Sequence, residues 1–280
     1  MPVVRSVALV YNLPGLPSNF TLVLSRSAIA DIFAGNITWW NDTTLAELNP
    51  GVILPAESII LVVRKDSSGT SQIMTAALSS FSSFWASTYG IFSSSSWPFY
   101  TYKGMTSTGV VGIVGSLPYS FGYVDQDSAV QDQLKYAAII NKAGNTILPT
   151  VVSVQAAVDA HENSFTNLTR FTTTIADGSG ADAYPLVAFS YYIVRKTLTG
   201  NCTEKLEMLR FFYYALYDQG AAGIAVDNYF VTMPTPLADL VASVLGELTC
   251  SGVHIFNTST SKTHATLRHP HLHKLNFFFF

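Results

Sequence analysis

The sequence predicts an α/β fold, because short apolar runs of strand length alternate with segments whose apolar residues recur at helical spacing. The clearest strands are residues 7–11 and 59–63, and the clearest helical spacing is at residues 73–81. No internal repeat of about 20 to 50 residues is visible, which argues against solenoid and propeller folds. The 280 residues are enough to bury the core of one large or two medium domains.

Local patterns predict the elements of the first half. Ile29, Ile32 and Phe33 share one face of a helix that starts near residue 27, and Gly35 ends it because glycine adopts the left-handed conformation easily. A short polar turn separates the second strand from its helix. Further elements are predicted as a helix at 106–115, strands at 121–124 and 136–140, and a helix at 151–160.

The second half is predicted to be mainly helical after one more strand. The run 185–194 is apolar without alternation, which is typical of a strand buried on both faces. Helices are predicted at 204–217 and 237–248. Residues 257–280 lack apolar periodicity and end in four phenylalanines, so we expect a disordered or artefactual tail there.

The composition excludes several classes of protein. Hydrophobic residues make up 49% of the chain and charged residues 12%, which argues against a disordered, collagenous or coiled-coil chain. The 15 basic and 18 acidic residues leave a net charge of -3, so no positive field is present to bind nucleic acid. No run of about 20 consecutive apolar residues occurs, so we expect no direct membrane insertion.

Sequons and cysteines predict an extracellular or periplasmic protein. Six Asn-x-Ser/Thr sequons are candidates for N-glycosylation: Asn19, Asn36, Asn41, Asn167, Asn201 and Asn257. In an oxidising compartment Cys202 and Cys250 can form one disulfide, and two buried free thiols are the alternative. No signal peptide is visible, so we interpret the protein either as cytosolic or as lacking its true start, and the sequons favour the second interpretation.

The polar turn that starts at Arg64 carries the clearest chemistry. The first turn of a helix leaves about four backbone N–H groups without intrahelical partners and carries a partial positive charge, so it binds anions. Gly69 allows an oxyanion close to the backbone, and Ser68 and Thr70 add hydroxyl donors. Arg64 offers a planar fork of N–H donors. The simpler alternative is that Ser68 only caps the helix while Arg64 pairs with Asp66 at the surface.

Asp66 indicates which anion the turn would bind. A carboxylate beside an anion is unfavourable unless Arg64 holds it or the ligand donates a proton to it. Hydrogen phosphate is both an oxyanion and a hydrogen-bond donor, whereas sulfate has no proton to offer. The turn therefore predicts a phosphate site formed by Arg64, Asp66, Ser68, Gly69 and Thr70. Arsenate or a phosphate ester is an alternative, because Asp66 distinguishes these anions from sulfate but not from one another.

Seven short motifs occur together along the chain. They are IFAGNITWWND from residue 32, LNPG from 48, LP from 54, VRKDSSGTS from 63, GVV from 109, LPYSFGYV from 117 and YPL from 184. In combination they resemble the PstS-like phosphate-binding proteins of phosphate ABC transporters, a family of periplasmic binding proteins. The resemblance extends from about residue 5 to residue 250.

The resemblance implies a type II periplasmic-binding fold, a two-lobed "Venus flytrap" of mixed sheets flanked by helices, with phosphate held between the lobes. It implies that Arg64, Ser68, Gly69 and Thr70 contact phosphate and that Asp66 accepts the phosphate proton. It implies a binding protein without catalysis. We expect a membrane permease or a fused membrane receptor as partner, and no cofactor. The implied divisions are a crossing strand and lobe I remnant at 1–11, lobe II at 12–183, the return strand and helical part of lobe I at 184–256, and the tail at 257–280.

Two features depart from the family. Its members have a long stretch before the first crossing strand that supplies the other half of the phosphate shell, so we expect this chain to be truncated at its N-terminus, with an incomplete first lobe. They also often have an Asn-Asp-Gly turn where this chain has no acid between Thr106 and Gly109. That difference puts selectivity in doubt if the turn touches the ligand.

Other functions have less support in the sequence. No Gly-x-Ser-x-Gly elbow, Walker loop or Gly-x-Gly-x-x-Gly fingerprint occurs, and His161 is interpreted as a surface residue at a helix end, so we expect no enzyme. The tail contains four histidines, His264, His269, His271 and His273. No cysteine or carboxylate accompanies them, so no metal site is predicted there. An alternative function is an extracellular receptor or matrix module whose degenerate flytrap domain binds another ligand or none.

Overall fold

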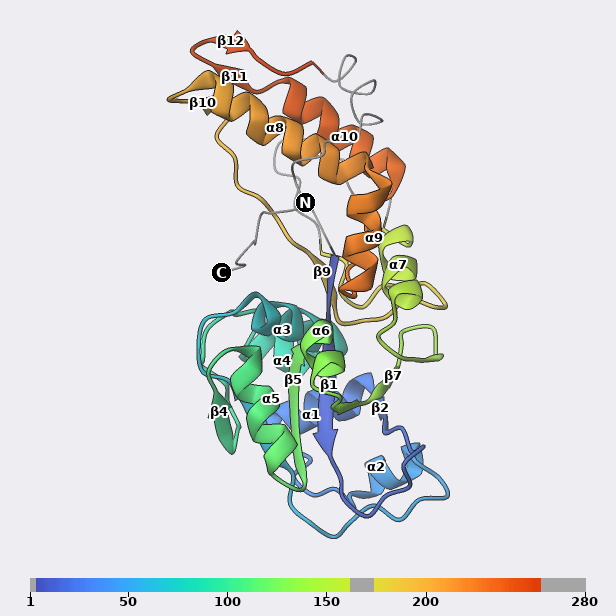
Figure 1. Cartoon of the computed structure of the whole chain (residues 1–280). Coiled ribbons are helices and arrows are strands. Elements are labelled where there is room, and N and C mark those ends of the chain that lie inside the picture. Colours follow the sequence, from blue (N-terminus) through green and yellow to red (C-terminus); the bar gives the residue numbers. More distant parts are fainter. Residues whose placement is uncertain (1–3, 162–173, 258–280) are drawn as a thin grey trace. The chain divides into compact units, whose positions relative to one another are not determined.

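The computed structural model describes residues 4–161 and 174–257, and Figure 1 shows the chain coloured along its sequence. Asn167 and the histidine-rich and phenylalanine-rich tail from residue 258 lie outside the described residues. The chain divides into two compact units.

The larger unit consists of Val3–Ser190 and Val226–Val231, and the smaller contains Tyr191–Ala225 and the chain from Thr232 onward. The sequence predicts a division near residue 184 and a first strand that crosses between lobes. In the structure this first strand lies inside the sheet of the larger unit. A crossing role for it stays a prediction.

A six-stranded mixed sheet forms the core of the larger unit, in the order β4-β3-β5-β1-β6, with β9 also paired to β1. β3 runs parallel to both β4 and β5, and β1 runs antiparallel to β5 with Val7 opposite Asp125. The carboxyl ends of β3, β4 and β5 therefore lie at one edge of the sheet. The strands are β1 (Val4–Asn12), β3 (Ile60–Arg64), β4 (Tyr102–Gly104), β5 (Ser120–Asp125), β6 (Lys135–Tyr136) and β9 (Val187–Phe189).

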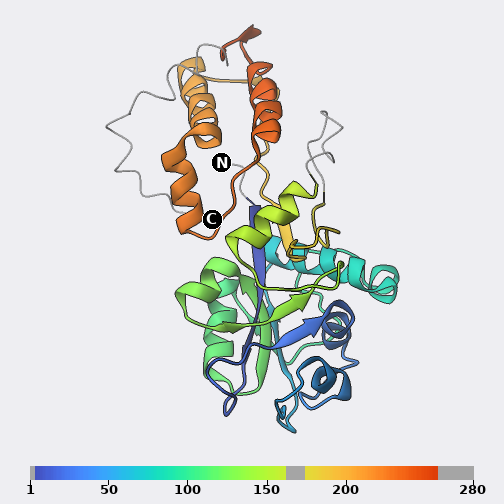
Figure 2. The ribbon, with the colours of Figure 1, turned by 90° about the vertical axis from the view of Figure 1, so that its right-hand side faces the viewer.

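The two faces of this sheet bury different kinds of side chain. On one face, aliphatic residues of the sheet pack against Val110 and Val114 of α5 (Thr106–Ser116). These sheet residues are Ala8, Val10, Val62 and Val124. On the other face, Phe121 and Tyr123 of β5 pack against Phe33 of α1 (Arg26–Ala34), with ring centroids 5.9 Å apart in both pairs. Strand alternation explains the separation, because successive side chains of β5 point to opposite faces. Figure 2 shows α5 and α1 on opposite sides of the sheet.

Helix ends in the larger unit follow the predicted capping chemistry. Ser25 caps α1 by accepting the N–H of Ala28, and Gly35 ends it in the left-handed conformation with φ 81°. The polar turn leads into α3 (Gly69–Phe81), as predicted. The remaining helices of this unit within the described residues are α2 (Thr43–Leu48), α4 (Ser83–Thr88), α6 (Gln126–Gln131) and α7 (Val151–Asp159).

A second, three-stranded sheet lies in the larger unit, in the order β2-β7-β8. It consists of β2 (Val23–Ser25), β7 (Ala138–Ile140) and β8 (Thr146–Ile147). The single strand predicted at 136–140 is thus divided between two sheets. The division falls at Ala137, whose N–H donates to the carbonyl of Leu9 at 2.8 Å.

The smaller unit is built on a helix pair and a small sheet. α8 (Cys202–Tyr217) and α10 (Thr235–Gly246) carry most of its core, in which Leu209 and Leu245 are buried. Its strands are β10 (Thr197–Leu198), β11 (Thr249–Cys250) and β12 (Val253–His254), and α9 (Gln219–Asp227) follows α8 in the chain. Among the described residues, no helix is both long and apolar enough to cross a membrane.

The prediction of a strand at 185–194 is wrong over most of that range. Within this run only Val187–Phe189 forms a strand, which pairs antiparallel with Val4–Ser6 of β1. Beyond it, Tyr192 is 53% exposed and Ile193 is 101% exposed. An apolar run forms a strand only where a partner backbone can pair with it, and periodicity alone contains no information on the partner.

Candidate anion site

The candidate site lies at the carboxyl edge of the larger sheet, where β3 ends and α3 begins. Ser68 caps α3, since its Oγ accepts the N–H of Thr70 at 3.1 Å. Gly69 is exposed, and a Cβ added to it would meet nothing within 4 Å beyond its chain neighbours and its own helix backbone, so space is left for an anion at this residue. Both Ser68 and Thr70 are buried. The structure thus places the five predicted ligand residues within one turn.

Arg64 and Asp66 form a two-bond ion pair at the base of this turn. Nε of Arg64 lies 2.9 Å from Oδ1 of Asp66, and Nη2 lies 2.6 Å from Oδ2. The arginine side chain is 9% exposed and the aspartate side chain 26%, so the pair is partly buried rather than a surface pair. Oδ1 of Asp66 also accepts the backbone N–H of Thr106 at 3.0 Å.

Both members of the pair are held in their charged forms. The hydrogen bond from Arg64 is the main cause that lowers the pKa of Asp66 to about 2. Burial of Arg64 disfavours its charge, but the hydrogen bond to Asp66 and the nearby charges of Asp66 and Asp125 raise the pKa of the guanidinium above its ordinary value. A buried guanidinium beside a helix N-terminus is a strong donor set for an oxyanion.

Two further residues, missed by the sequence analysis, are hydrogen-bonded to the predicted ones. Nη1 of Arg64 donates to Oγ of Ser107 at 3.0 Å and lies 3.5 Å from Oγ1 of Thr70. Oγ1 of Thr70 donates to Oδ1 of Asp125 at 2.9 Å, and Oγ of Ser107 donates to Oδ2 at 2.8 Å. The hydrogen of Thr70, predicted from the sequence to face the ligand, is therefore directed at Asp125.

The position of these two residues follows from the sheet topology. Asp125 ends β5 and Arg64 ends β3, and the two strands are parallel neighbours. Ser107 lies in the first turn of α5, which follows β4, the neighbour of β3 on the other side. Polar residues directly after predicted strands are a usable signal, because ligands of open α/β sheets bind at the carboxyl ends of strands.

Tyr123 supports the site from within the core. Its Oη accepts the backbone N–H of Arg64 at 3.2 Å and shares a hydrogen bond of 2.6 Å with Oγ of Ser71. Burial raises the pKa of this phenol to about 12. These contacts hold the end of β3 and the first turn of α3 in a defined position.

Comparisons with known proteins identify the family. Residues 2–216 match the model of the PBP superfamily domain. The phosphate-binding protein PstS of Haemophilus influenzae is 31% identical over 242 residues, an alignment that covers 86% of this chain and 70% of that protein. The chain is a PstS-like member of the PBP superfamily.

Another relative of this PstS-like chain is longer than the region they share. PstS of Methanocaldococcus jannaschii is 34% identical over 250 residues, which is 85% of this chain and 64% of the relative. A high-affinity periplasmic phosphate-binding protein, solved with bound phosphate, superposes with a TM-score of 0.63 at 19% identity over 92% of this chain and 73% of that one. This likeness confirms the predicted α/β fold of the periplasmic-binding type.

A relative of a different kind also matches the PstS-like chain. It is a serine/threonine-protein kinase/receptor, so named, of Acanthamoeba polyphaga mimivirus, and it is 26% identical over 259 residues. The alignment covers 89% of this chain but 16% of the viral protein. A domain of this family is thus also found within a much larger protein.

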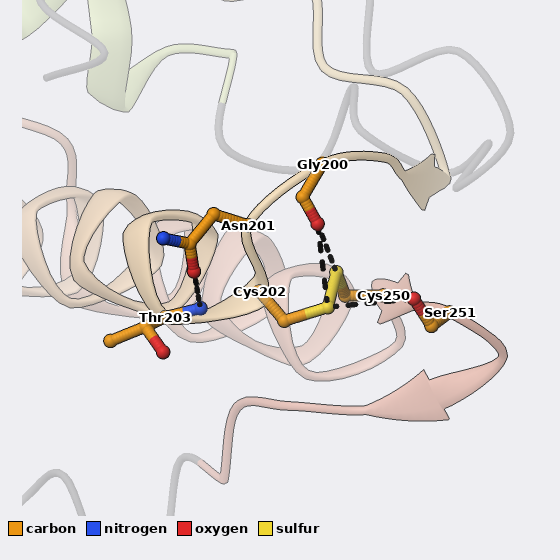
Figure 3. Close-up of a disulfide and its surroundings, with 6 residues drawn as sticks. All are labelled: Gly200, Asn201, Cys202, Thr203, Cys250 and Ser251. Atoms are coloured by element: carbon orange, nitrogen blue, oxygen red, sulfur yellow. Dashed lines mark hydrogen bonds between the residues drawn. A yellow bond between two sulfur atoms is a disulfide. The ribbon is translucent and has the colours of Figure 1, made fainter.

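The two cysteines of the PstS-like chain form a disulfide in the smaller unit (Figure 3), with a Cα–Cα distance of 5.7 Å. It joins the start of α8 to β11, 48 residues apart in the chain. Oδ1 of Asn201 caps α8 by accepting the N–H of Thr203 at 3.0 Å (Figure 3).

The sequon asparagines within the described residues are all exposed: Asn19, Asn36, Asn41, Asn201 and Asn257. Two of them already use their side-chain amides, because Nδ2 of Asn36 donates to Asp31 at 3.0 Å and Nδ2 of Asn201 to Glu204 at 3.3 Å. Glycosylation of these side chains stays a prediction.

Proposed function

We propose that this chain binds hydrogen phosphate at the turn between β3 and α3. The observation that carries the proposal is the buried guanidinium of Arg64 beside the open N-terminal turn of α3, with Ser68, Gly69 and Thr70 around it. A helix N-terminus with a fixed arginine fork complements the oxygens of a tetrahedral oxyanion. The names of the PstS relatives support phosphate as that oxyanion.

The hydrogen bonds of Asp66 favour a positioning role for this residue. Oδ1 already accepts two hydrogens and Oδ2 accepts one, all from within the protein. Asp66 binds Nε and Nη2 of Arg64, and Nη1 faces Thr70 and Ser107, so one of the five N–H groups of the guanidinium, on Nη2, is left for a ligand. Accepting the proton of the ligand, the role predicted from the sequence, would use the remaining lone pair of Oδ2.

The experiment that tests this proposal is isothermal titration of the purified protein with phosphate and with sulfate. We expect phosphate to bind and sulfate to bind far more weakly. Replacing Arg64 by alanine leaves Asp66 without its partner and should weaken phosphate binding by about 2 to 5 kcal/mol. Arg64→Lys should be intermediate, because lysine retains the charge but not the fork.

A charge-matched control is available in the smaller unit. Arg210 pairs with Glu207 at 2.6 Å, and both side chains are more than half exposed. Arg210→Ala removes the same charge and should leave phosphate affinity unchanged. Equal phosphate affinity in Arg64→Ala and the wild type would contradict the site assignment.

We further propose that the chain acts as a solute-binding protein for phosphate uptake or sensing outside the cytoplasm, without catalytic turnover. Its relatives named PstS are binding proteins by name, and this supports a binding role. A membrane permease is the corresponding partner. Crosslinking of the phosphate-loaded protein in membranes of its source tests for one.

A receptor module is the second candidate function, and the mimivirus relative favours it. In that protein the matching region is 16% of a chain named as a kinase/receptor. If this chain belongs to such a receptor, its transcript encodes a membrane segment and a kinase domain in the same reading frame. Sequencing the full-length transcript distinguishes the two candidates.

A further inference from the structure

Four side chains of the anion site form a closed ring of hydrogen bonds. Nη1 of Arg64 faces the hydroxyls of Thr70 and Ser107, at 3.5 and 3.0 Å. Each hydroxyl in turn faces one oxygen of Asp125, at 2.9 and 2.8 Å. The four residues come from four elements: β3, α3, α5 and β5.

The chemistry of the two end groups fixes the direction of every hydrogen in this ring. A guanidinium has only donors, and an ionised carboxylate has only acceptors. Each hydroxyl lies between one of each, so its single hydrogen points to Asp125 and a lone pair points to Arg64. The remaining capacity of each hydroxyl is its second lone pair, which can accept a hydrogen but cannot donate one.

We propose that Asp125 is a positioning residue that makes the site select a protonated oxyanion. By taking the hydrogens of Thr70 and Ser107, it turns both hydroxyls into acceptors toward the bound anion. An anion that carries a proton can donate to such a hydroxyl, whereas sulfate would place an oxygen against its lone pair. This inference rests on the proposed function, and it assigns to Asp125 and its two hydroxyls a selectivity that the sequence assigns to Asp66.

The burial of the ring supports a fixed direction. Arg64, Thr70 and Ser107 are 7%, 6% and 8% exposed, so water does not compete freely for their hydrogen bonds. If either hydroxyl turns its hydrogen to the ligand, an oxygen of the half-buried Asp125 loses the donor that it has within the protein. That cost arises for sulfate and not for hydrogen phosphate.

The test compares two neighbouring carboxylates by isothermal titration with phosphate and sulfate. Asp125→Asn keeps the shape but offers one acceptor and one donor, so one hydroxyl must turn its hydrogen away from residue 125. Asp127 is half-buried two residues further on, and none of its side-chain hydrogen bonds within the described chain involves Thr70 or Ser107. Asp127→Asn therefore removes the same charge without changing the ring.

We expect Asp125→Asn to lower the ratio of phosphate to sulfate affinity by more than about tenfold, mainly by strengthening sulfate binding. Asp127→Asn should change both affinities alike and leave the ratio within about twofold. An unchanged ratio in Asp125→Asn, or an equal fall in both variants, overturns the inference. A wild-type protein that binds no phosphate overturns the proposed function and this inference with it.

If Asp125→Asn does not fold, a second pair of variants tests whether the hydroxyl of Thr70 selects the anion. Thr70→Ser retains the hydroxyl and should retain the ratio of affinities. Thr70→Val removes the hydroxyl at similar volume and should lower the ratio. Equal ratios in these two variants would show that the hydroxyl does not select the anion, which overturns the inference.

Discussion

The guanidinium of Arg64 bonds both carboxylate oxygens of Asp66, with Nε 2.9 Å from Oδ1 and Nη2 2.6 Å from Oδ2. Asp66 also accepts the N–H of Thr106, so it ties the end of β3 to the start of α5. Thr106 has φ 59°, an uncommon value for a residue with a Cβ. The turn that lacks the acid expected from the family therefore contacts the site through its backbone and through Ser107.

Acid pH should weaken the ion pair between Arg64 and Asp66, and it should do so in a defined pH range. The pKa of Asp66 is lowered from 3.8 to about 2, mainly by the hydrogen bond from Arg64. Because the folded-state pKa lies below the unfolded one, the stabilisation is fully present above about pH 4 and is lost as the pH falls through about 2. Since the side chain is 26% exposed, solvent reduces the effect, and we expect about 1 to 2 kcal/mol at pH 7.

The measurement is urea unfolding of the wild type and Asp66→Asn between pH 7 and pH 2. The difference in free energy of unfolding should shrink toward the acid end. Glu57→Gln, at an exposed position, serves as a control that should show little difference at any pH. A difference for Asp66→Asn that stays constant down to pH 2 would contradict the assigned cause.

Adding a methyl group to Gly122 of β5 or to Gly112 of α5 should change the free energy of unfolding in opposite directions. A Cβ on Gly122 of β5 would lie 2.9 Å from the carbonyl oxygen of Val62 and 3.2 Å from Cγ1 of Val110, so Gly122→Ala overpacks the core. We expect a loss of about 1 to 3 kcal/mol in the free energy of unfolding.

Gly112 is the matched control, because a Cβ there would meet nothing within 4 Å and the residue lies on the exposed side of α5. Gly112→Ala should stabilise the protein by about 0.5 to 1 kcal/mol, since alanine favours helix over glycine. Chemical denaturation of both variants measures the effects. Stabilisation by Gly122→Ala would show that the sheet and α5 are not packed as described.

The disulfide should stabilise the fold of the smaller unit. It closes a loop between residues 48 positions apart, and its removal is expected to cost about 2 to 4 kcal/mol. Thermal unfolding of Cys202→Ser/Cys250→Ser and of the oxidised wild type compares the two states. Mass spectrometry after alkylation without reductant provides the check, because two free thiols in protein purified under non-reducing conditions would contradict the bridge.

Local sequence was sufficient for the elements whose signals are local. The turn from Arg64 to Thr70 and its helix form as predicted, because the cap at Ser68 and the apolar spacing of α3 depend only on neighbouring residues. The same holds for α1, whose end at Gly35 requires a positive φ. The motifs spread along the chain were also sufficient to indicate the family.

Tertiary structure decided what depends on partners distant in the chain. The run at 185–194 forms a strand only where β1 offers it a backbone to pair with. Asp125 and Ser107 join Arg64 because β3 lies between β4 and β5 in the sheet, and strand order cannot be read from hydrophobic spacing. The direction of the hydroxyl of Thr70 follows from that order as well, since Asp125 accepts its hydrogen.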